Sequence, residues 1–156
     1  ESMAWVAILT SLFQMVISTG VLLLYLIFVN QTLPWTIILL PLIVFPLMLF
    51  ALGISWIISS TTVYVRDVSQ IIGPITLILL FVSPVFYPVS SLPDNFQFLL
   101  YLNPITWAVE QSRNVILWGL VPGITGYLSY TIISVLIGWF GYLWFRRLRP
   151  GFSDVI

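Results

Sequence analysis

The chain has 156 residues, of which 60% are hydrophobic and only 6% are charged, with a formal net charge of zero. Soluble domains carry about a quarter of charged residues, so this composition predicts an integral membrane protein of the all-α class. The chain contains no cysteine, histidine or lysine. Their absence excludes disulfides, thiolate and imidazole chemistry, the usual zinc ligands and a phosphate-binding loop of the GxxxxGK[ST] type.

Residues 4–29 form the first apolar segment, which exceeds the roughly twenty residues that a membrane-spanning helix needs. Small and polar residues recur in it at helical spacing: Ala7, Ser11, Gln14 and Ser18. We interpret this face as a close helix-packing surface, because small residues let helices approach one another in lipid; a contact to substrate is the less favoured alternative. No signal peptide precedes the segment, so we expect an N-terminally truncated fragment.

Residues 35–63 form the second predicted span, which contains Pro41 and Pro46. Prolines kink a helix, but neighbouring groups in a membrane bundle can satisfy the freed carbonyls. A second small-residue face follows them in the sequence: Ala51, Ser55, Ser59 and Thr62.

Residues 71–87 form the third predicted span, preceded by a short connection that carries Arg66 and Asp67. Pro84 and Pro88 interrupt the apolar run near the point where this helix would leave the membrane. Beyond the interruption we expect a helix over residues 91–102, since Pro93 and Asp94 suit a first helical turn.

A second short helix is predicted over residues 104–118, with Asn103 as its N-cap and Pro104 at its first position. This helix has an apolar side and a polar side, and the polar side contains Thr106, Glu110, Arg113 and Asn114. We predict that the two short helices form a re-entrant pair, which dips into the membrane from one surface before the last span.

Residues 121–145 form the last predicted span, with a small-residue face made of Gly126, Tyr130, Ser134, Gly138 and Gly141. It ends in Arg146, Arg147 and Arg149, and arginines directly after a span mark the cytoplasmic side. Counting back places Arg66 on the cytoplasmic side and the insertion 88–119 outside, with Arg113 as its one arginine.

The order of these motifs resembles a known family of membrane proteins. The motifs are Arg66-Asp67 before a span, Ser83-Pro84-Val85-Phe86-Tyr87-Pro88, Leu92-Pro93, Asn103-Pro104, and an arginine-rich end followed by Gly151-Phe152. This set is similar to the permease subunits of ABC-2 type exporters, in the branch that exports O-antigen, capsule or teichoic acid chains.

The resemblance implies a particular architecture and particular partners. Residues 1–156 would be the C-terminal part of a six-span permease domain, with four transmembrane helices and the re-entrant pair. Two permease copies would form the channel in the bacterial inner membrane, and each would engage a separate ATP-binding subunit, so that this chain binds no cofactor itself. The ATPase-coupling helix would lie upstream of Glu1.

The side chains around the re-entrant stretch suit a path for sugars, which present apolar ring faces and hydroxyl groups. The predicted pathway and gate residues are Phe81, Ser83, Phe86, Tyr87, Tyr101, Asn103, Trp107, Glu110, Gln111 and Arg113. An interfacial aromatic belt is the competing interpretation. We further expect Glu110 and Arg113, three residues apart on a helix, to hold the outer end of the path shut; an exposed surface pair of little energetic value is the alternative.

Three functions remain open at this point. The first is the channel-forming subunit of an ATP-driven exporter of polysaccharide or lipid-linked glycan. The second is an ABC-2 permease for a drug or a lipid. The third is an intramembrane enzyme or a structural membrane protein. The enzyme is disfavoured because the chain has no histidine or cysteine and no acidic residue in the middle of a predicted span.

Overall fold

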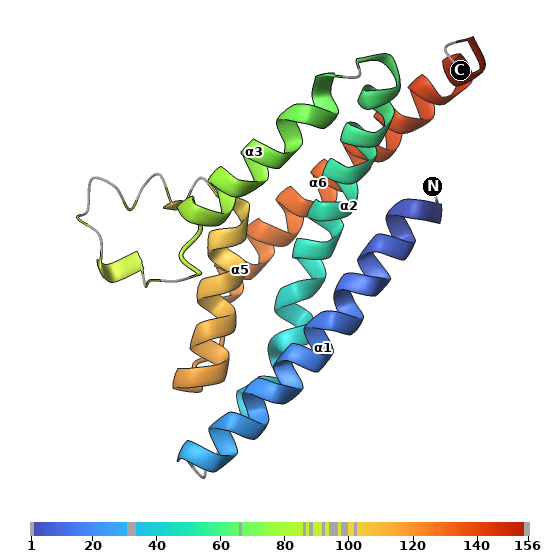
Figure 1. The fold of residues 1–156 in the computed structure, drawn as a ribbon. Helices are drawn as coiled ribbons and strands as arrows, with labels where there is room; N and C mark the ends of the chain where they lie inside the picture. The colour runs from blue at the N-terminus through green and yellow to red at the C-terminus, as the bar shows by residue number, and fades with distance from the viewer. Residues whose placement is uncertain are drawn as a thin grey trace.

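We describe the protein from a computed structural model, which describes residues 2–30, 34–65, 67–85, 87, 89–91, 93, 97, 100–101 and 103–154. These residues contain helices and no strand (Figure 1). The helices in chain order are α1 (Ser2–Asn30), the 3₁₀ turn η1 (Trp35–Leu39), α2 (Leu40–Tyr64), α3 (Asp67–Val82), the 3₁₀ turn η2 (Val89–Ser91), α5 (Pro104–Arg113), the π-helical turn η3 (Asn114–Trp118), α6 (Ile124–Leu148) and the 3₁₀ turn η4 (Arg149–Asp154).

Three helical stretches of the described chain are long and apolar enough to cross a membrane: Ile8–Val29, Trp35–Tyr64 and Ile124–Gly151. They agree with the first, second and last predicted spans. The third predicted span, 71–87, differs: α3 begins earlier, so that Asp67 lies in its first turn, and it ends at Val82. Its 16 residues measure about 24 Å, less than the roughly 30 Å of a hydrocarbon core. The four-span count therefore stays a prediction.

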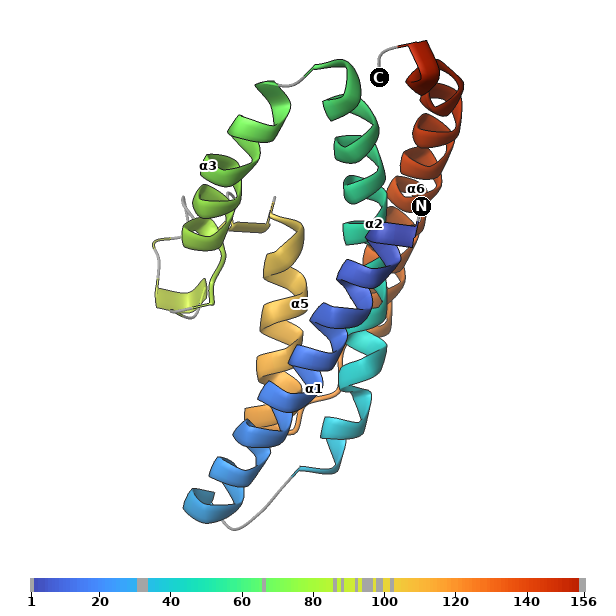
Figure 2. The same ribbon diagram turned by 45° about the vertical axis from the view of Figure 1, so that its right-hand side comes forward.

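The core of the molecule is the pair α2 and α6, which run in the same direction and cross at glycines (Figures 1 and 2). A Cβ atom added to Gly141 would lie 2.8 Å from the Cα atom of Gly53, and one added to Gly53 would lie 2.8 Å from the Cα atom of Gly138. No side chain fits at such distances. The small-residue face predicted on α6 is thus confirmed, with Tyr130 and Ser134 also buried in it.

The small-residue faces predicted on the first two spans are partly exposed in this chain, and Ser55 and Thr62 of the second face are half-buried. Ser11, Gln14 and Ser18 are exposed on α1, which meets α2 through larger side chains such as Leu12 and Met15. Ser11 of α1 and Ala51 of α2 also border the space between these helices, so one residue of each predicted face lies at this contact. On α2, Ala51 and Ser59 are exposed. The helix buries Leu52, Gly53 and Ser60 instead.

The two prolines of the second predicted span have different places. Pro41 lies in the first turn of α2, directly after the 3₁₀ turn η1, so it starts this helix rather than kinking it. Pro46 lies inside α2 and is fully buried.

Helices α3 and α5 meet end to end along one side of the α2–α6 pair. The cap of α5 lies beside the last turns of α3, and α5 continues to the end of the molecule where α1 joins α2 (Figures 1 and 2). The predicted helix over 104–118 is thus observed, in an α-helical and a π-helical part. The helix predicted over 91–102 lies largely outside the described residues, and the re-entrant arrangement stays a prediction.

Candidate functional site

The site is the interface between the polar side of α5 and the turn that follows α3, of which the structure describes residues 83–85, 87 and 89–91, η2 included. Asn103 begins it: its side-chain oxygen accepts a hydrogen bond from the Ile105 amide at 3.0 Å, as the predicted N-cap should. Its amide nitrogen donates to the carbonyl of Leu79 in α3 at 3.2 Å. The residue is only 5% exposed, so one buried side chain both caps α5 and ties it to α3.

Arg113 and Glu110 contact the same turn from further along α5. The Nη2 atom of Arg113 donates to the carbonyl of Pro84 at 2.7 Å and points to that of Val85 at 3.4 Å. Glu110 accepts from the Val89 amide at 3.4 Å. Proline ends α3 here and leaves backbone groups without helical partners. The two charged side chains therefore each bind the backbone of the turn, at separate points.

Several polar atoms at this interface have no hydrogen-bond partner among the described residues. They are the hydroxyl oxygens of Ser83 and Thr106 and the Nη1 atom of Arg113. Ser83 and Thr106 are fully buried. Native structures pair nearly all such atoms, so these three atoms are the groups of the interface whose hydrogen bonds the described residues leave unmade.

The predicted aromatic residues divide between two places. Tyr87 donates to the carbonyl of Phe81 at 3.1 Å and so covers the end of α3. The Phe81 ring itself is exposed, as is Tyr101. Trp107 faces away from them, toward α6, where it stacks on Tyr130 with ring centroids 4.6 Å apart. Phe86 lies outside the described residues, and Gln111 is half-buried on α5.

Tyr130 contacts the start of α5, although the sequence analysis placed it only among small packing residues. Its hydroxyl donates to the carbonyl of Pro104 at 2.9 Å, which fixes the first turn of α5 against α6. A tyrosine in the middle of a span needs a partner for its hydroxyl, and this signal could have identified the contact.

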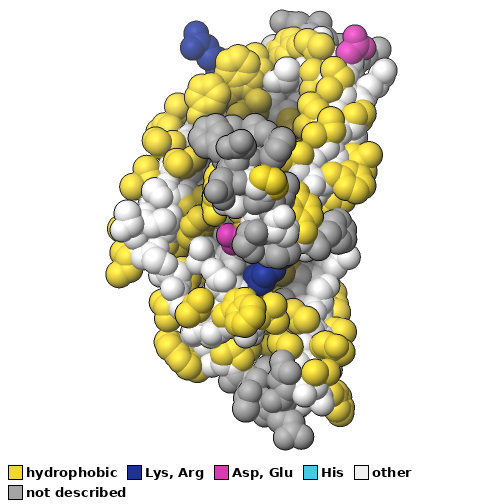
Figure 3. Space-filling view, turned by 90° about the vertical axis from the view of Figure 1, so that its left-hand side faces the viewer, with side chains coloured by type: hydrophobic (Ala, Val, Ile, Leu, Met, Phe, Trp, Pro, Cys, Tyr) yellow, Lys and Arg dark blue, Asp and Glu magenta, His cyan; other side chains and the backbone are white. Residues whose placement is uncertain are grey.

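Figure 3 shows the side of the molecule that faces left in Figure 1. Hydrophobic side chains cover much of its described surface. An acidic and a basic side chain lie close together near the middle of the view, and further charged side chains lie at its upper left and upper right.

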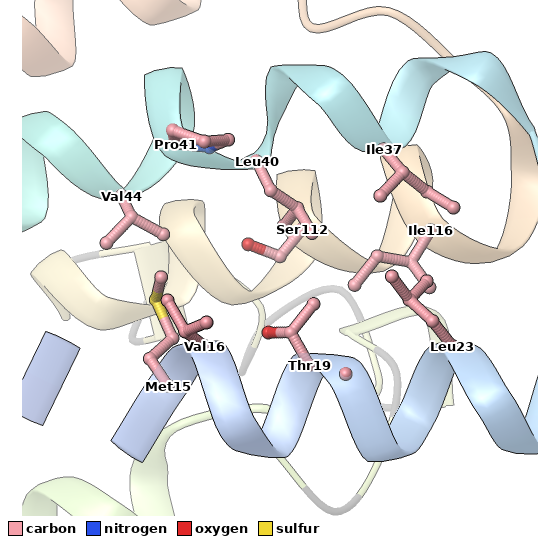
Figure 4. Close-up of a pocket in the computed structure, with 11 residues that line it drawn as sticks. Met15, Val16, Thr19, Leu23, Ile37, Leu40, Pro41, Val44, Ser112 and Ile116 are labelled. Atoms are coloured by element: carbon pink, nitrogen blue, oxygen red, sulfur yellow. The ribbon is translucent and has the colours of Figure 1, made fainter. Parts of the chain in front are cut away.

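A cavity of about 500 Å³ separates α1 from η1, α2 and α5. Figure 4 shows Thr19 of α1 and Ser112 of α5 with their hydroxyl oxygens near its middle, among apolar side chains such as Met15, Val44 and Ile116. None of the predicted pathway residues lines this cavity. It is therefore separate from the interface of α5 with the turn.

The C-terminal ends of α2 and α6 lie together at the end of the molecule opposite to η1 and η3. Tyr64 donates to the Leu148 carbonyl at 2.9 Å, and the Trp144 indole donates to the Thr61 hydroxyl at 3.3 Å. Asp67 is exposed at the start of α3, while Arg66 lies outside the described residues. Three exposed arginines follow or end α6 here: Arg146, Arg147 and Arg149.

Residues 1–117 match the family model described as ABC-2 type transporter. This chain belongs to the ABC-2 type transporter family. As a member it is a transmembrane permease subunit, and its apolar helices fit that role. The site described above is thus a feature of an ABC-2 permease.

Curated relatives of this ABC-2 permease include two named O-antigen export system permease protein RfbA. The protein from Myxococcus xanthus is 24% identical over 151 residues, which are 96% of this chain and 58% of the relative. The protein from Klebsiella pneumoniae is 22% identical over 122 residues, which are 74% of this chain and 44% of the relative. The chain thus spans about half the length of these relatives.

Proposed function

We propose that this chain forms part of the path by which an ATP-driven exporter moves polysaccharide or lipid-linked glycan across the bacterial inner membrane. The observation that carries the proposal is the similarity to a permease named for O-antigen export over 96% of the chain. The exporter would hydrolyse ATP on a separate subunit, and a second permease copy would complete the channel.

The path for sugar is proposed at the interface of α5 with the turn after α3. Exposed rings of Phe81 and Tyr101 offer apolar faces for sugar rings, and buried hydrogen-bonding groups on Ser83, Asn103 and Thr106 lie on neighbouring segments. Neutral polar groups with aromatic faces suit a long chain that has to slide, because no single contact holds it strongly.

The arginine-rich end is proposed to face the cytoplasm, which places η1 and η3 outside. In this orientation Arg113 and Glu110 hold the turn after α3 on the outer half of the molecule. We propose that they help to keep the path shut between export cycles. The proposal is supported by the direct contacts of both side chains to the backbone of that turn.

The test is export by the complete permease, reconstituted with its ATP-binding partner in vesicles. We expect ATP-dependent movement of glycan, and none when the partner is omitted or when ATP is replaced by a non-hydrolysable analogue. Movement of a drug or a lipid in place of glycan would contradict the cargo and support the alternative. Vectorial transport by the permease alone would contradict the need for a partner. Glycosyltransferase genes beside the coding sequence would be the matching genetic observation.

A further inference from the structure

The turn η3, which directly follows α5, is a π-helix, a rare conformation in proteins. Residues Asn114–Trp118 form it, and Gly119 ends it with φ +65°. A π turn contains more residues than an α turn, and such turns occur mostly as single insertions in α-helices at functional sites. We therefore expect a contact from outside the turn to stabilise its π-helical conformation.

The backbone alone leaves one buried carbonyl of the π turn in need of a donor. The amides of Gly119 and Leu120 are the two backbone donors that could reach the Val115 carbonyl in an α- or a π-helix. Both bond to the carbonyl of Asn114 instead, the latter at 3.1 Å. The Val115 carbonyl takes its hydrogen bond from the hydroxyl of Thr36 in η1, at 2.7 Å.

The Thr36–Val115 contact is buried from solvent and closely packed. Both residues are 0% exposed, and Ile43, also 0% exposed, packs in the same cluster as Val115. A Cβ atom added to Gly119 would lie 3.3 Å from the Cβ atom of Pro34. A buried carbonyl cannot turn to water here, so the Thr36 hydroxyl is the group that satisfies it in this conformation.

We propose that Thr36 acts as the lock of a turn with two conformations. Residues 114–118 are π-helical while the Thr36 hydroxyl donates to the Val115 carbonyl, and they become α-helical when this hydrogen bond breaks. This inference rests on the proposed function, because the switch would serve the opening of the outer end during export. The first turn of α5 is fixed by Asn103 and Tyr130. Conversion of the turn therefore moves the residues after it, namely Trp118 and the connection to α6. These residues shift by one position in the helical register, which is a rotation of about 100° around the helix axis.

Hydrogen exchange of the amides of residues 117–120 tests the lock. The sample is the complete permease with its ATP-binding partner in lipid nanodiscs. Without nucleotide, we expect these amides to exchange roughly five- to tenfold faster in Thr36→Val than in wild type. The amides leave their hydrogen-bond acceptors each time the turn converts between its π- and α-helical forms, and loss of the buried hydrogen bond makes that conversion more frequent. Thr36→Ser keeps the hydroxyl and should exchange like wild type. Thr10→Val is the matched control, since its hydroxyl bonds only within α1, to Val6.

A second measurement, made during ATP hydrolysis, shows whether the π-helical turn changes conformation or keeps one conformation throughout. During ATP turnover, wild-type amides should speed up to the rate of resting Thr36→Val, and the variant should gain little more. An unchanged rate in resting Thr36→Val would overturn the lock, and an unchanged wild-type rate during measured ATP hydrolysis would overturn the switch. The resting arm needs neither cargo nor ATP. Expected exchange in both arms without glycan export would count against the proposed cargo alone.

Discussion

Arg113 is the residue at which the energetics of the site can be measured most directly. A guanidinium group in apolar surroundings is costly unless it is hydrogen-bonded, and here the acceptors are backbone carbonyls exposed by the end of α3. Glu110 plays a different part, because it accepts from a backbone amide and its contact needs an acceptor oxygen rather than a charge.

We therefore expect Arg113→Gln and Glu110→Gln to have unequal effects. Arg113→Gln shortens the donor and should cost about 1.5–3 kcal/mol of stability, the range for a hydrogen bond to a charged group, and make reconstituted vesicles leaky to a small polar solute. Glu110→Gln keeps an acceptor oxygen and should change either measurement little. Equal leaks from the two variants would contradict this assignment.

Asn103 combines two contacts that substitutions can separate. Asn103→Asp keeps the acceptor that caps α5 but removes the donor to Leu79, whereas Asn103→Ala removes both. Loss of an N-cap costs about 1 kcal/mol, so thermal unfolding in detergent should rank wild type above Asn103→Asp and Asn103→Asp above Asn103→Ala. If Asn103→Asp were as unstable as Asn103→Ala, the contact to α3 would be the important one.

At the scale of helices, the sequence predicts where a helix begins better than it predicts which segment that helix packs against. Asn103 and Pro104 correctly predict the start of α5, because capping is local chemistry. Two alternatives were expected for the charged residues on the polar side of this helix, Glu110 and Arg113: a pair that holds the path shut, or an exposed surface pair. Both charged side chains are half-buried and bind the backbone of the turn after α3. Sequence periodicity cannot reveal this contact, since Pro84 lies 29 residues before Arg113. The face of α6 was predicted correctly. Those of α1 and α2 stay predictions, because small residues show where contact is possible and not which helix makes it.

The crossing of α2 and α6 gives the sharpest prediction for a whole element. Gly141→Ala places a methyl group against the backbone of Gly53 and should destabilise the permease by about 1–3 kcal/mol, as overpacking does. Gly20→Ala on α1 is the control, since a Cβ atom there meets nothing within 4 Å. Thermal unfolding and yield in detergent measure both. Equal behaviour of the two variants would show that the crossing is looser than described.

At the scale of the molecule, the orientation can be tested because the chain has no cysteine. We expect Ser91→Cys to react with a membrane-impermeant maleimide from the outer side and Val65→Cys from the cytoplasmic side, as the arginine distribution requires. Inside-out vesicles give the reciprocal control. Reaction of Ser91→Cys from the cytoplasmic side alone would reverse the orientation.

The parallel course of α2 and α6 has a consequence for how the protein is made. Gly53 meets Gly141, a separation of 88 residues along the chain, and synthesis at 5–20 residues per second would take about 4–18 s to cover it. During that interval α2 lies in the membrane without the helix that it packs against most closely. The backbone surface around Gly53 is then open to lipid, to the insertion machinery or to another nascent chain. The α2–α6 core forms only after α6 has been made.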